Sequence, residues 1–353
     1  MSVISEVEFE EVSGRDGNLG LITLTRQQVL NALNQKMINA IDTQLIEWES
    51  ANQIKAVVIR AAEGRAFCAG GDVRSVYERK LQRDPGLTDF FRDEYTLNRR
   101  IHDYSKPYIA LLNGITMGGG VGISAHASHR VASDKLLFAM PETGIGFYPD
   151  VGTTWILSRL PNKLGYYLGL TGARITTGDC IAAGLVDYQI DAQQFSELIY
   201  ALADCAFEND ERASVSQVIK NFSVVPSPSE LFSYENIIAE CFSEKTVEKI
   251  ISALKDQKNN WCEEVVSLLA TKSPTSLKVT LRALQEAEHL DFDDAIQREF
   301  CLTTHFLGAK DFFEGIRAVL VDKDQMPRWT PATLNEVTAA EVKKYFLPVE
   351  REL

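Results

Sequence analysis

The sequence contains few of the residues on which metal and redox sites depend. It has 5 His and 6 Cys among 353 residues, and no two Cys form a Cys-x-x-Cys pair. Zinc ribbons and dithiol sites need such pairs, so the scattered Cys argue against both. We therefore expect no metal site, no redox cofactor and free thiols in a reducing compartment. His126 and His129 have no carboxylate pattern beside them, and we expect them on a solvated helix face.

Long apolar runs and an excess of positive charge are also missing. No uninterrupted apolar stretch approaches the roughly 18 residues that a membrane span needs. Asp and Glu number 49 against 36 Lys and Arg, a net charge of −13, which repels nucleic acid and anionic membranes. Residues 1–8 are acidic and lack the basic and apolar regions of a secretory or transit peptide. We therefore expect a cytoplasmic protein whose partners include neither nucleic acid nor membrane.

Common nucleophile and nucleotide motifs are absent as well. The sequence has no Gly-x-Ser-x-Gly elbow and no Gly-rich phosphate-binding loop that ends in Gly-Lys-Ser/Thr. Residues 120–125 match the dinucleotide pattern Gly-x-Gly-x-x-Ala. The predicted strand before them ends near Asn113, several residues too early, and the pattern does not open the fold. We interpret the match as coincidental.

The chain changes character near residue 190. Up to that point, short apolar strands alternate with helical patterns, which predicts an α/β fold with parallel strand pairing. Later patterns are mostly helical, so we expect a catalytic core over residues 1–190 and a C-terminal helical region over residues 191–353. The predicted elements are a hairpin over 7–25, helices over 34–50, from 73, and over 88–105, 119–127 and 151–160, and strands over 56–60, 108–112, 131–132 and 136–139.

Two glycine-rich turns, residues 67–72 and 113–122, each follow a predicted strand and precede a predicted helix. Glycine has no Cβ, so its backbone can approach a ligand closely. The first turn of a helix also carries N–H groups without intrahelical partners. Two such groups aimed at one point would form an oxyanion hole for a thioester oxygen. Tight turns that only pack against their neighbours are the alternative, and the spacing leaves both open.

Two carboxylates lie in the apolar, glycine-rich segment 140–152. They are Glu142 and Asp150, eight residues apart. An apolar setting raises a carboxyl pKa by desolvation, which suits acid–base or nucleophilic chemistry. The alternative for Glu142 is a rim residue just past a strand. The alternative for Asp150 is the N-cap of the next helix.

Several of these segments together resemble one protein family. They are Leu30-Asn31-Ala32-Leu33 and residues 66–74, 114–122, 140–152, 183–187, 272–278, 313–319 and 323–329. In this combination the chain resembles the crotonase (enoyl-CoA hydratase/isomerase) superfamily over nearly its whole length. The resemblance implies a crotonase-like spiral of ββα units, with a C-terminal helical region that closes over the active site. It also implies an acyl-CoA ligand whose thioester oxygen binds the main-chain N–H groups of Gly71 and Gly119.

Departures from the superfamily pattern indicate the reaction. Enoyl-CoA hydratases carry a second catalytic Glu at the position that is Gly122 here, and tend to have Gly at the position of Asp150. In both respects the chain resembles the hydrolase branch of the superfamily. That resemblance implies Glu142 and Asp150 as catalytic residues, and it places Glu94, Gly119 and both catalytic acids at the substrate. The alternative for Glu94 is a solvated helix residue.

The same resemblance implies a thioester hydrolase for a short 3-hydroxyacyl-CoA, foremost (S)-3-hydroxyisobutyryl-CoA from valine breakdown. The products are the free hydroxy acid and CoA, and no cofactor is implied because CoA is part of the substrate. A hydratase or isomerase, and a non-catalytic acyl-CoA-binding protein, are the alternatives. Arg26 and Arg65 are candidates for binding the CoA phosphates, with surface solvation as the alternative for each. Superfamily relatives often form oligomers, so a homo-oligomer is also expected.

Overall fold

The computed structural model describes residues 6–207, 210–350 and 353. They group into two compact units that alternate along the chain. Unit 1 comprises residues 1–71, 96–138 and 175–230, and unit 2 comprises residues 72–95, 139–174 and 231–353. The region from residue 191 onward thus contributes to both units. The separate core and C-terminal region expected from the sequence stay a prediction.

Unit 1 is built on a six-stranded sheet with the order β1-β2-β3-β5-β7-β10. Its strands are β1 (Val7–Ser13), β2 (Asn18–Leu24), β3 (Ile54–Ala61), β5 (Tyr108–Leu112), β7 (His129–Ala132) and β10 (Tyr188–Gln189). β1 and β2 pair antiparallel, with Val7 opposite Leu24, and the other neighbours pair parallel. The predicted hairpin and the predicted parallel pairing are both confirmed.

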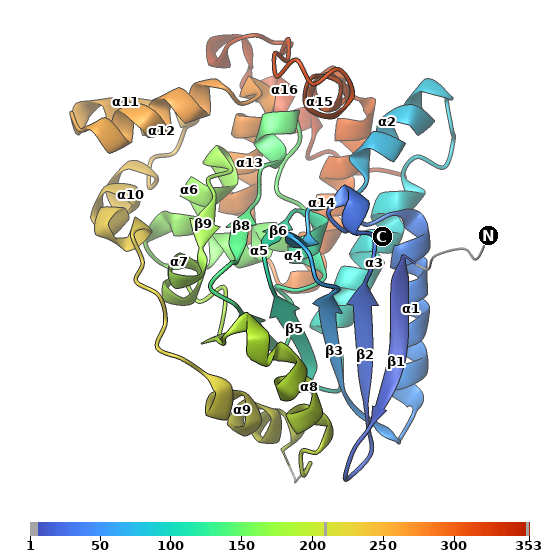
Figure 1. Cartoon of the computed structure of the whole chain (residues 1–353). Helices are drawn as coiled ribbons and strands as arrows, with labels where there is room; N and C mark the ends of the chain where they lie inside the picture. Colours follow the sequence, from blue (N-terminus) through green and yellow to red (C-terminus); the bar gives the residue numbers. More distant parts are fainter. Residues whose placement is uncertain (1–5, 208–209, 351–352) are drawn as a thin grey trace. The chain divides into compact units, whose positions relative to one another are not determined.

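Helix α1 (Gln35–Ser50) packs on one face of this sheet, alongside β1 and β2 (Figure 1). It begins after Asn34, whose side chain accepts a hydrogen bond from the Met37 N–H. Its Trp48 ring packs on β2 at Gly20, where a Cβ would come within 2.6 Å of the ring. The glycine therefore provides the room in which the indole sits, and the helix predicted over 34–50 is confirmed.

Helices α8 (Phe195–Ala203) and α9 (Glu211–Phe222) cover the other face. Side chains alternate along a strand, so Leu19 and Leu21 point away from the α1 side. The buried apolar cluster here joins four strands to both helices: Leu19, Leu21, Ala56, Val58, Ile109, Leu111, Val131, Ile190, Phe195, Leu198, Ile199, Leu202, Ala203, Val215 and Ile219. Because the sheet is buried on both faces, its inner strands are apolar runs rather than alternating ones.

A second, four-stranded sheet in unit 1 has the order β4-β6-β8-β9. Its strands are β4 (Ala66–Cys68), β6 (Ile115–Met117), β8 (Leu137–Ala139) and β9 (Ile175–Thr176). Helix α4 (Gly119–Gly122) follows β6, and α7 (Thr177–Ala182) follows β9. The helix predicted over 119–127 is therefore too long. Three of the four α4 residues are glycines, which favour helix poorly, and the helix ends after one turn.

Unit 2 is mainly helical. Its helices are α2 (Val73–Leu81), the first half of α3 (Asp89–His102), α5 (Thr153–Ser158), α6 (Leu164–Thr171), α10 (Glu235–Cys241), α11 (Val247–Asp256), α12 (Asn260–Ala270), α13 (Pro274–Ala287), α14 (Phe292–Gly308), α15 (Lys310–Ile316) and α16 (Ala339–Lys344). Aromatic rings pack at its centre, where Phe147 stacks on Phe312 and Tyr148 stacks on Phe306. Within the described residues, each helix is too short or too polar to span a bilayer.

Candidate active site

The two glycine-rich turns lie side by side in unit 1. Strands β4 and β6 pair parallel, with Ala66 opposite Ile115, so the turns that follow them leave the same edge. A Cβ on Gly70 would lie 3.9 Å from the Gly119 nitrogen, and a Cβ on Gly120 would lie 2.2 Å from the Cys68 carbonyl oxygen. The packing between the turns therefore requires the absence of a side chain at Gly120.

Both turns also offer main-chain N–H groups. Gly119 is the first residue of α4, and Gly118 before it adopts φ 47° and contributes no side-chain cap. Gly71 directly precedes Asp72, the N-cap of α2. In the described part of the chain, neither the Gly71 N–H nor the Gly119 N–H donates to a main-chain oxygen outside helices and strands. Both groups are thus available to an anionic ligand oxygen.

Unit 2 brings three of the predicted site residues together. Glu94 lies on α3, Glu142 begins the short 3-10 helix η2 (Glu142–Ile145), and Asp150 lies in the loop before α5. They are 2%, 7% and 5% exposed respectively. We call these three residues the acid cluster. The solvated helix position considered for Glu94 and the rim position considered for Glu142 are both wrong, because both side chains are buried.

Burial and mutual repulsion dominate the electrostatics of the acid cluster. Burial raises the pKa of Glu94 well above its usual value, and the Asp150 charge raises it further. Burial, then Asp150 and then Glu94, raise the pKa of Glu142. Burial raises the pKa of Asp150 to about 7, against a lowering by the Tyr95 hydroxyl. These raised pKa values suit the cluster to proton transfer.

Two oxygens of the acid cluster lack a hydrogen-bond partner in the described part of the chain. Within the described residues, Glu94 Oε1 and Glu142 Oε2 are buried and have no hydrogen-bond partner. Buried polar atoms are nearly always paired in native proteins. Orphaned oxygens in a cluster of this kind therefore indicate a site that a polar substrate or a water completes.

Asp150 is held by a tyrosine that the sequence analysis missed. The Tyr95 hydroxyl lies 2.6 Å from Asp150 Oδ2 and 2.6 Å from Thr303 Oγ1 of α14. Thr303 Oγ1 in turn lies 2.8 Å from the Tyr148 hydroxyl. Tyr95 directly follows Glu94 in the sequence, but an aromatic residue at helical spacing is indistinguishable from a core residue.

The loop that presents Asp150 is fixed by a buried glutamate. Glu299 of α14 accepts hydrogen bonds from the Gly152 N–H at 2.6 Å, the Thr154 N–H at 2.9 Å and the Thr154 hydroxyl at 2.6 Å. The N-cap of α5 is Gly152 and not Asp150, so the capping role considered for Asp150 is wrong. Val151 in this loop adopts φ 57°, a strained conformation for a β-branched residue.

The remaining candidates lie apart from this chemistry. Arg26 forms an ion pair with Glu6 at 2.8 Å and donates to the Ala32 carbonyl, whereas the Arg65 side chain is exposed. His129 is buried in β7 and hydrogen-bonded to Ser128 and Ser216, and His126 is also buried. The solvated helix face predicted for the two histidines is therefore wrong.

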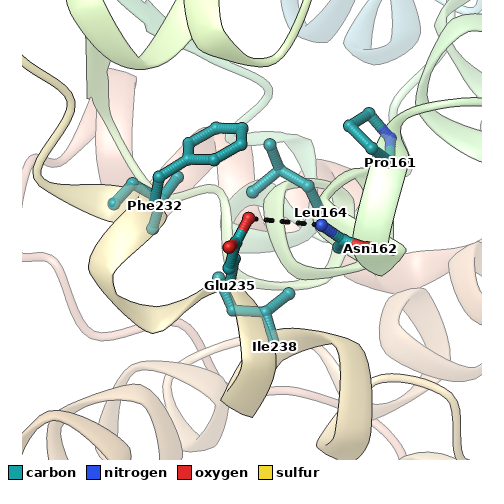
Figure 2. A pocket seen from close by; sticks show the side chains of 7 residues that line it. Pro161, Asn162, Leu164, Phe232, Glu235 and Ile238 are labelled. Atoms are coloured by element: carbon teal, nitrogen blue, oxygen red, sulfur yellow. Dashed lines mark hydrogen bonds between the residues drawn. The ribbon is translucent and has the colours of Figure 1, made fainter.

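Potential metal ligands do not gather anywhere in the described residues: no group of three or more His, Cys, Asp or Glu could hold an ion. The six cysteines, all among the described residues, are buried and form no disulfide. Figure 2 shows a small apolar pocket of unit 2, lined by residues that include Leu164, Phe232 and Ile238, with the Asn162 amide bonded to Glu235. It contains no member of the acid cluster, so it is not the reaction site.

The chain is similar to a family of known proteins over most of its length. Residues 19–346 match the family model described as enoyl-CoA hydratase/isomerase. The human mitochondrial 3-hydroxyisobutyryl-CoA hydrolase is 40% identical over 351 residues, 98% of this chain and 90% of that protein. The Xenopus laevis enzyme of the same name is 42% identical over 335 residues, 94% of this chain and 86% of that protein.

Two solved structures are similar over almost the whole chain. A carnitinyl-CoA dehydratase from Mycobacterium thermoresistibile superposes with TM-score 0.90 at 37% identity, covering 99% of this chain and 98% of that one. An enoyl-CoA hydratase from Rhodobacter sphaeroides superposes with TM-score 0.88 at 35% identity, covering 98% of both chains. The fold class expected from the sequence is therefore confirmed.

One expectation is overturned by these relatives. The acidic N-terminal residues predict a cytoplasmic protein. The human, rat, mouse and Xenopus laevis relatives are mitochondrial enzymes. The cytoplasmic assignment is therefore wrong, because the sequence features used for it do not report the compartment of these relatives.

Proposed function

Since the chain belongs to the enoyl-CoA hydratase/isomerase family, we propose that it is an acyl-CoA thioester hydrolase that cleaves 3-hydroxyisobutyryl-CoA. Three relatives with that activity are 40%, 41% and 42% identical to this chain over at least 94% of its length. The observation that carries the proposal is the acid cluster. Three buried carboxyls, two of them with an oxygen that lacks a partner in the described residues, suit the hydrolysis of an ester-like bond.

In this proposal the Gly71 and Gly119 N–H groups bind the thioester oxygen. The oxygen gains negative charge as the carbonyl is attacked, and two fixed donors stabilise it without reorganisation. Loss of one such donor typically costs about 3–4 kcal/mol of transition-state stabilisation. The availability of both N–H groups supports this role.

Glu142 supplies the carboxylate that opens the thioester. Its oxygen either attacks the carbonyl carbon, forming a mixed anhydride as the C–S bond breaks, or takes a proton from the attacking water. Mass spectrometry of the protein, rapidly quenched during a single turnover, separates the routes. Attack by Glu142 adds the mass of the acyl group to the enzyme, whereas direct attack by water leaves the enzyme mass unchanged.

Glu94 and Asp150 contact the 3-hydroxyl of the substrate. Both side chains are buried, so an acyl group that lacks the hydroxyl would leave their carboxyl groups without this hydrogen bond. Isobutyryl-CoA should therefore react far more slowly than 3-hydroxyisobutyryl-CoA, preferably the (S) form. Comparable turnover of both would refute this selectivity. The hydroxyl-bearing substrate supports a place in valine degradation.

Binding of the CoA phosphates is assigned to Arg65, whose side chain is exposed, rather than to Arg26, which Glu6 already holds. Arg65→Ala should raise KM and leave kcat near the parent value. We also propose a homo-oligomer, which sedimentation of the purified protein tests.

The decisive experiment is thiol release from 3-hydroxyisobutyryl-CoA beside hydration of crotonyl-CoA. Thiol release is expected to dominate, because the chain has Gly122 at the position of the second catalytic Glu in the hydratases that it resembles. Glu142→Gln should lower kcat by about 10²-fold or more. The exposed Glu264→Gln should leave it unchanged. Crotonyl-CoA hydration at the faster rate, or thiol release by Glu142→Gln at the parent rate, would overturn the proposal.

A further inference from the structure

A row of hydroxyl groups connects Asp150 to a main-chain carbonyl inside unit 2. The order is Asp150 Oδ2, the Tyr95 hydroxyl, Thr303 Oγ1, the Tyr148 hydroxyl and the Glu299 carbonyl oxygen. The four successive oxygen–oxygen distances are 2.6, 2.6, 2.8 and 2.5 Å. All four are hydrogen-bond distances, and the side chains of the three hydroxyl residues are buried.

The number of protons in this row determines its direction. Each hydroxyl carries one proton, and a carbonyl oxygen carries none. Tyr148 must therefore donate to the Glu299 carbonyl, which leaves Thr303 to donate to Tyr148. Tyr95 must then donate to Thr303. The three hydroxyl protons are now used, and the contact between Tyr95 and Asp150 still lacks one.

We propose that Asp150 supplies the missing proton, so that Tyr95, Thr303 and Tyr148 act as positioning residues that keep Asp150 a neutral acid before the reaction. The proposal deepens the function proposed above and rests on it for the role of Asp150 as the catalytic acid. An ionised Asp150 would leave one close oxygen–oxygen contact of the buried row without a proton, which is unfavourable.

The surroundings of the acid cluster agree with this placement of the proton. The Asp150 charge raises the pKa values of the groups around it, which are Glu94, Glu142, Glu299, Tyr95 and Tyr148. Among the described residues, no cation contributes to the shift of the Asp150 pKa. A neutral Asp150 removes one negative charge beside Glu142. A Tyr95 hydroxyl that donates to Asp150 lowers the pKa of that carboxyl. A Tyr95 hydroxyl that accepts the Asp150 proton does not lower it.

The row also separates the roles of the two catalytic acids. A proton on Asp150 has the Tyr95 oxygen as its acceptor. Within the described residues, Glu142 Oε2 has no such acceptor, so a proton placed on that oxygen would lack a partner until a ligand binds. Neighbouring acids whose surroundings push their pKa values apart take opposite roles in catalysis.

The proton then moves in a balanced step. As the C–S bond breaks, the electron pair goes to sulfur, and the thiolate takes the proton from Asp150 to leave as CoA thiol. Asp150 is now a carboxylate, and the Tyr95 hydroxyl can turn to donate to it. In the anhydride route, water then attacks the acyl carbon and the bond between that carbon and the Glu142 oxygen breaks. The water proton returns to Asp150, and the hydroxyl stays on the product acid. The enzyme ends in its starting protonation state.

The test is the protonation of Asp150 in the substrate-free enzyme. Enzyme labelled with ¹³C at the Asp carboxyl carbons is titrated by NMR, and Asp150→Asn identifies the Asp150 signal. Thr303→Val removes the hydroxyl that takes the Tyr95 proton, so Tyr95 becomes free to donate to the Asp150 carboxylate. The apparent pKa of Asp150 should fall by about 1 pH unit, a tenfold weaker proton affinity.

Thr280→Val is the matched control, because Thr280 is fully buried in α13 and its hydroxyl has no partner among the described residues. It should leave the Asp150 titration unchanged. If Tyr95 donates to an ionised Asp150 in the parent, Thr303→Val will not shift the titration, and Tyr95→Phe alone will raise it. That result overturns the inference.

The activity profile gives a second readout. In Thr303→Val, the alkaline limb of kcat/KM for thiol release should move to lower pH by the same amount as the NMR titration. The NMR result needs no substrate, so the two proposals fail separately. An enzyme inactive on 3-hydroxyisobutyryl-CoA but with the expected titration refutes the proposed function alone.

Discussion

Replacing Asp150 by Asn is expected to stabilise the protein at neutral and alkaline pH while it removes the proposed catalytic acid. Asp150 is buried, and burial disfavours its ionised form. The Asn amide carries no charge, and its N–H can donate to the Tyr95 hydroxyl as the proton of a neutral Asp150 does. The substitution therefore keeps the packing and removes only the cost of ionising a carboxyl inside the protein.

The magnitude follows from the two pKa values. Burial raises the pKa of Asp150 from 3.8 to about 7. Between these values the folded protein keeps a proton that the unfolded chain has released, so the free energy of unfolding falls as pH rises, by about 1.4 kcal/mol per pH unit. The stability linked to Asp150 is fully present below pH 3.8 and is about 4 kcal/mol lower above pH 7. The Asn variant has no such loss.

Urea unfolding of parent and variant at about pH 5.5 and about pH 8.5 measures the effect. The stability advantage of Asp150→Asn should widen by about 2 kcal/mol between these two conditions. Asp204→Asn, at an exposed position, should show no widening. Identical pH dependence of the parent and Asp150→Asn would mean that Asp150 is ionised in the folded protein, and the reasoning on its proton would be refuted.

Two further substitutions test the packing around the site. Gly120→Ala should destabilise the protein by about 1–3 kcal/mol, because the added Cβ would clash with the Cys68 carbonyl oxygen. The thermal midpoint and the yield of folded protein should both fall. Gly64→Ala is the control, since its Cβ meets only ordinary contacts and should leave stability nearly unchanged. Glu299→Gln should lower the free energy of unfolding in urea by about 1–3 kcal/mol and should lower kcat, because the Gln amide places a donor against the Gly152 and Thr154 N–H groups. Glu264→Gln, at an exposed position, should change neither the stability nor kcat.

The sequence predicts well those helices and strands whose bounds depend on the local pattern of apolar and capping residues. Strand β5 has the predicted bounds, 108–112, because a short apolar run between polar turns has few other solutions. The helix predicted over 34–50 is found one residue shorter, because Asn34 is a strong cap. The helix predicted over 119–127 stops at Gly122, where glycine and the strand that starts at His129 outweigh the apolar spacing.

The candidate site shows the opposite limit. Glu94, Glu142 and Asp150 were identified through short motifs and a family resemblance, and the structure buries them together. Thr303 and Glu299 come from a helix about 150 residues further along the chain, inside a pattern typical of any buried helix. No local signal separates a threonine that serves a hydroxyl row from one that fills a core, since only the tertiary contact with Tyr95 makes the difference.

The buried acids of unit 2 differ in what their neighbours donate, and that difference assigns their roles better than residue type does. Glu299 receives three hydrogen bonds, which favour its ionised form against the burial that raises its pKa to about 8, and so it suits the task of holding the loop before α5. Asp150 meets a hydroxyl whose proton is already used, so it keeps its own. Glu142 has an oxygen that nothing in the described chain satisfies. In the proposed mechanism, this unpaired oxygen is the one that meets the substrate.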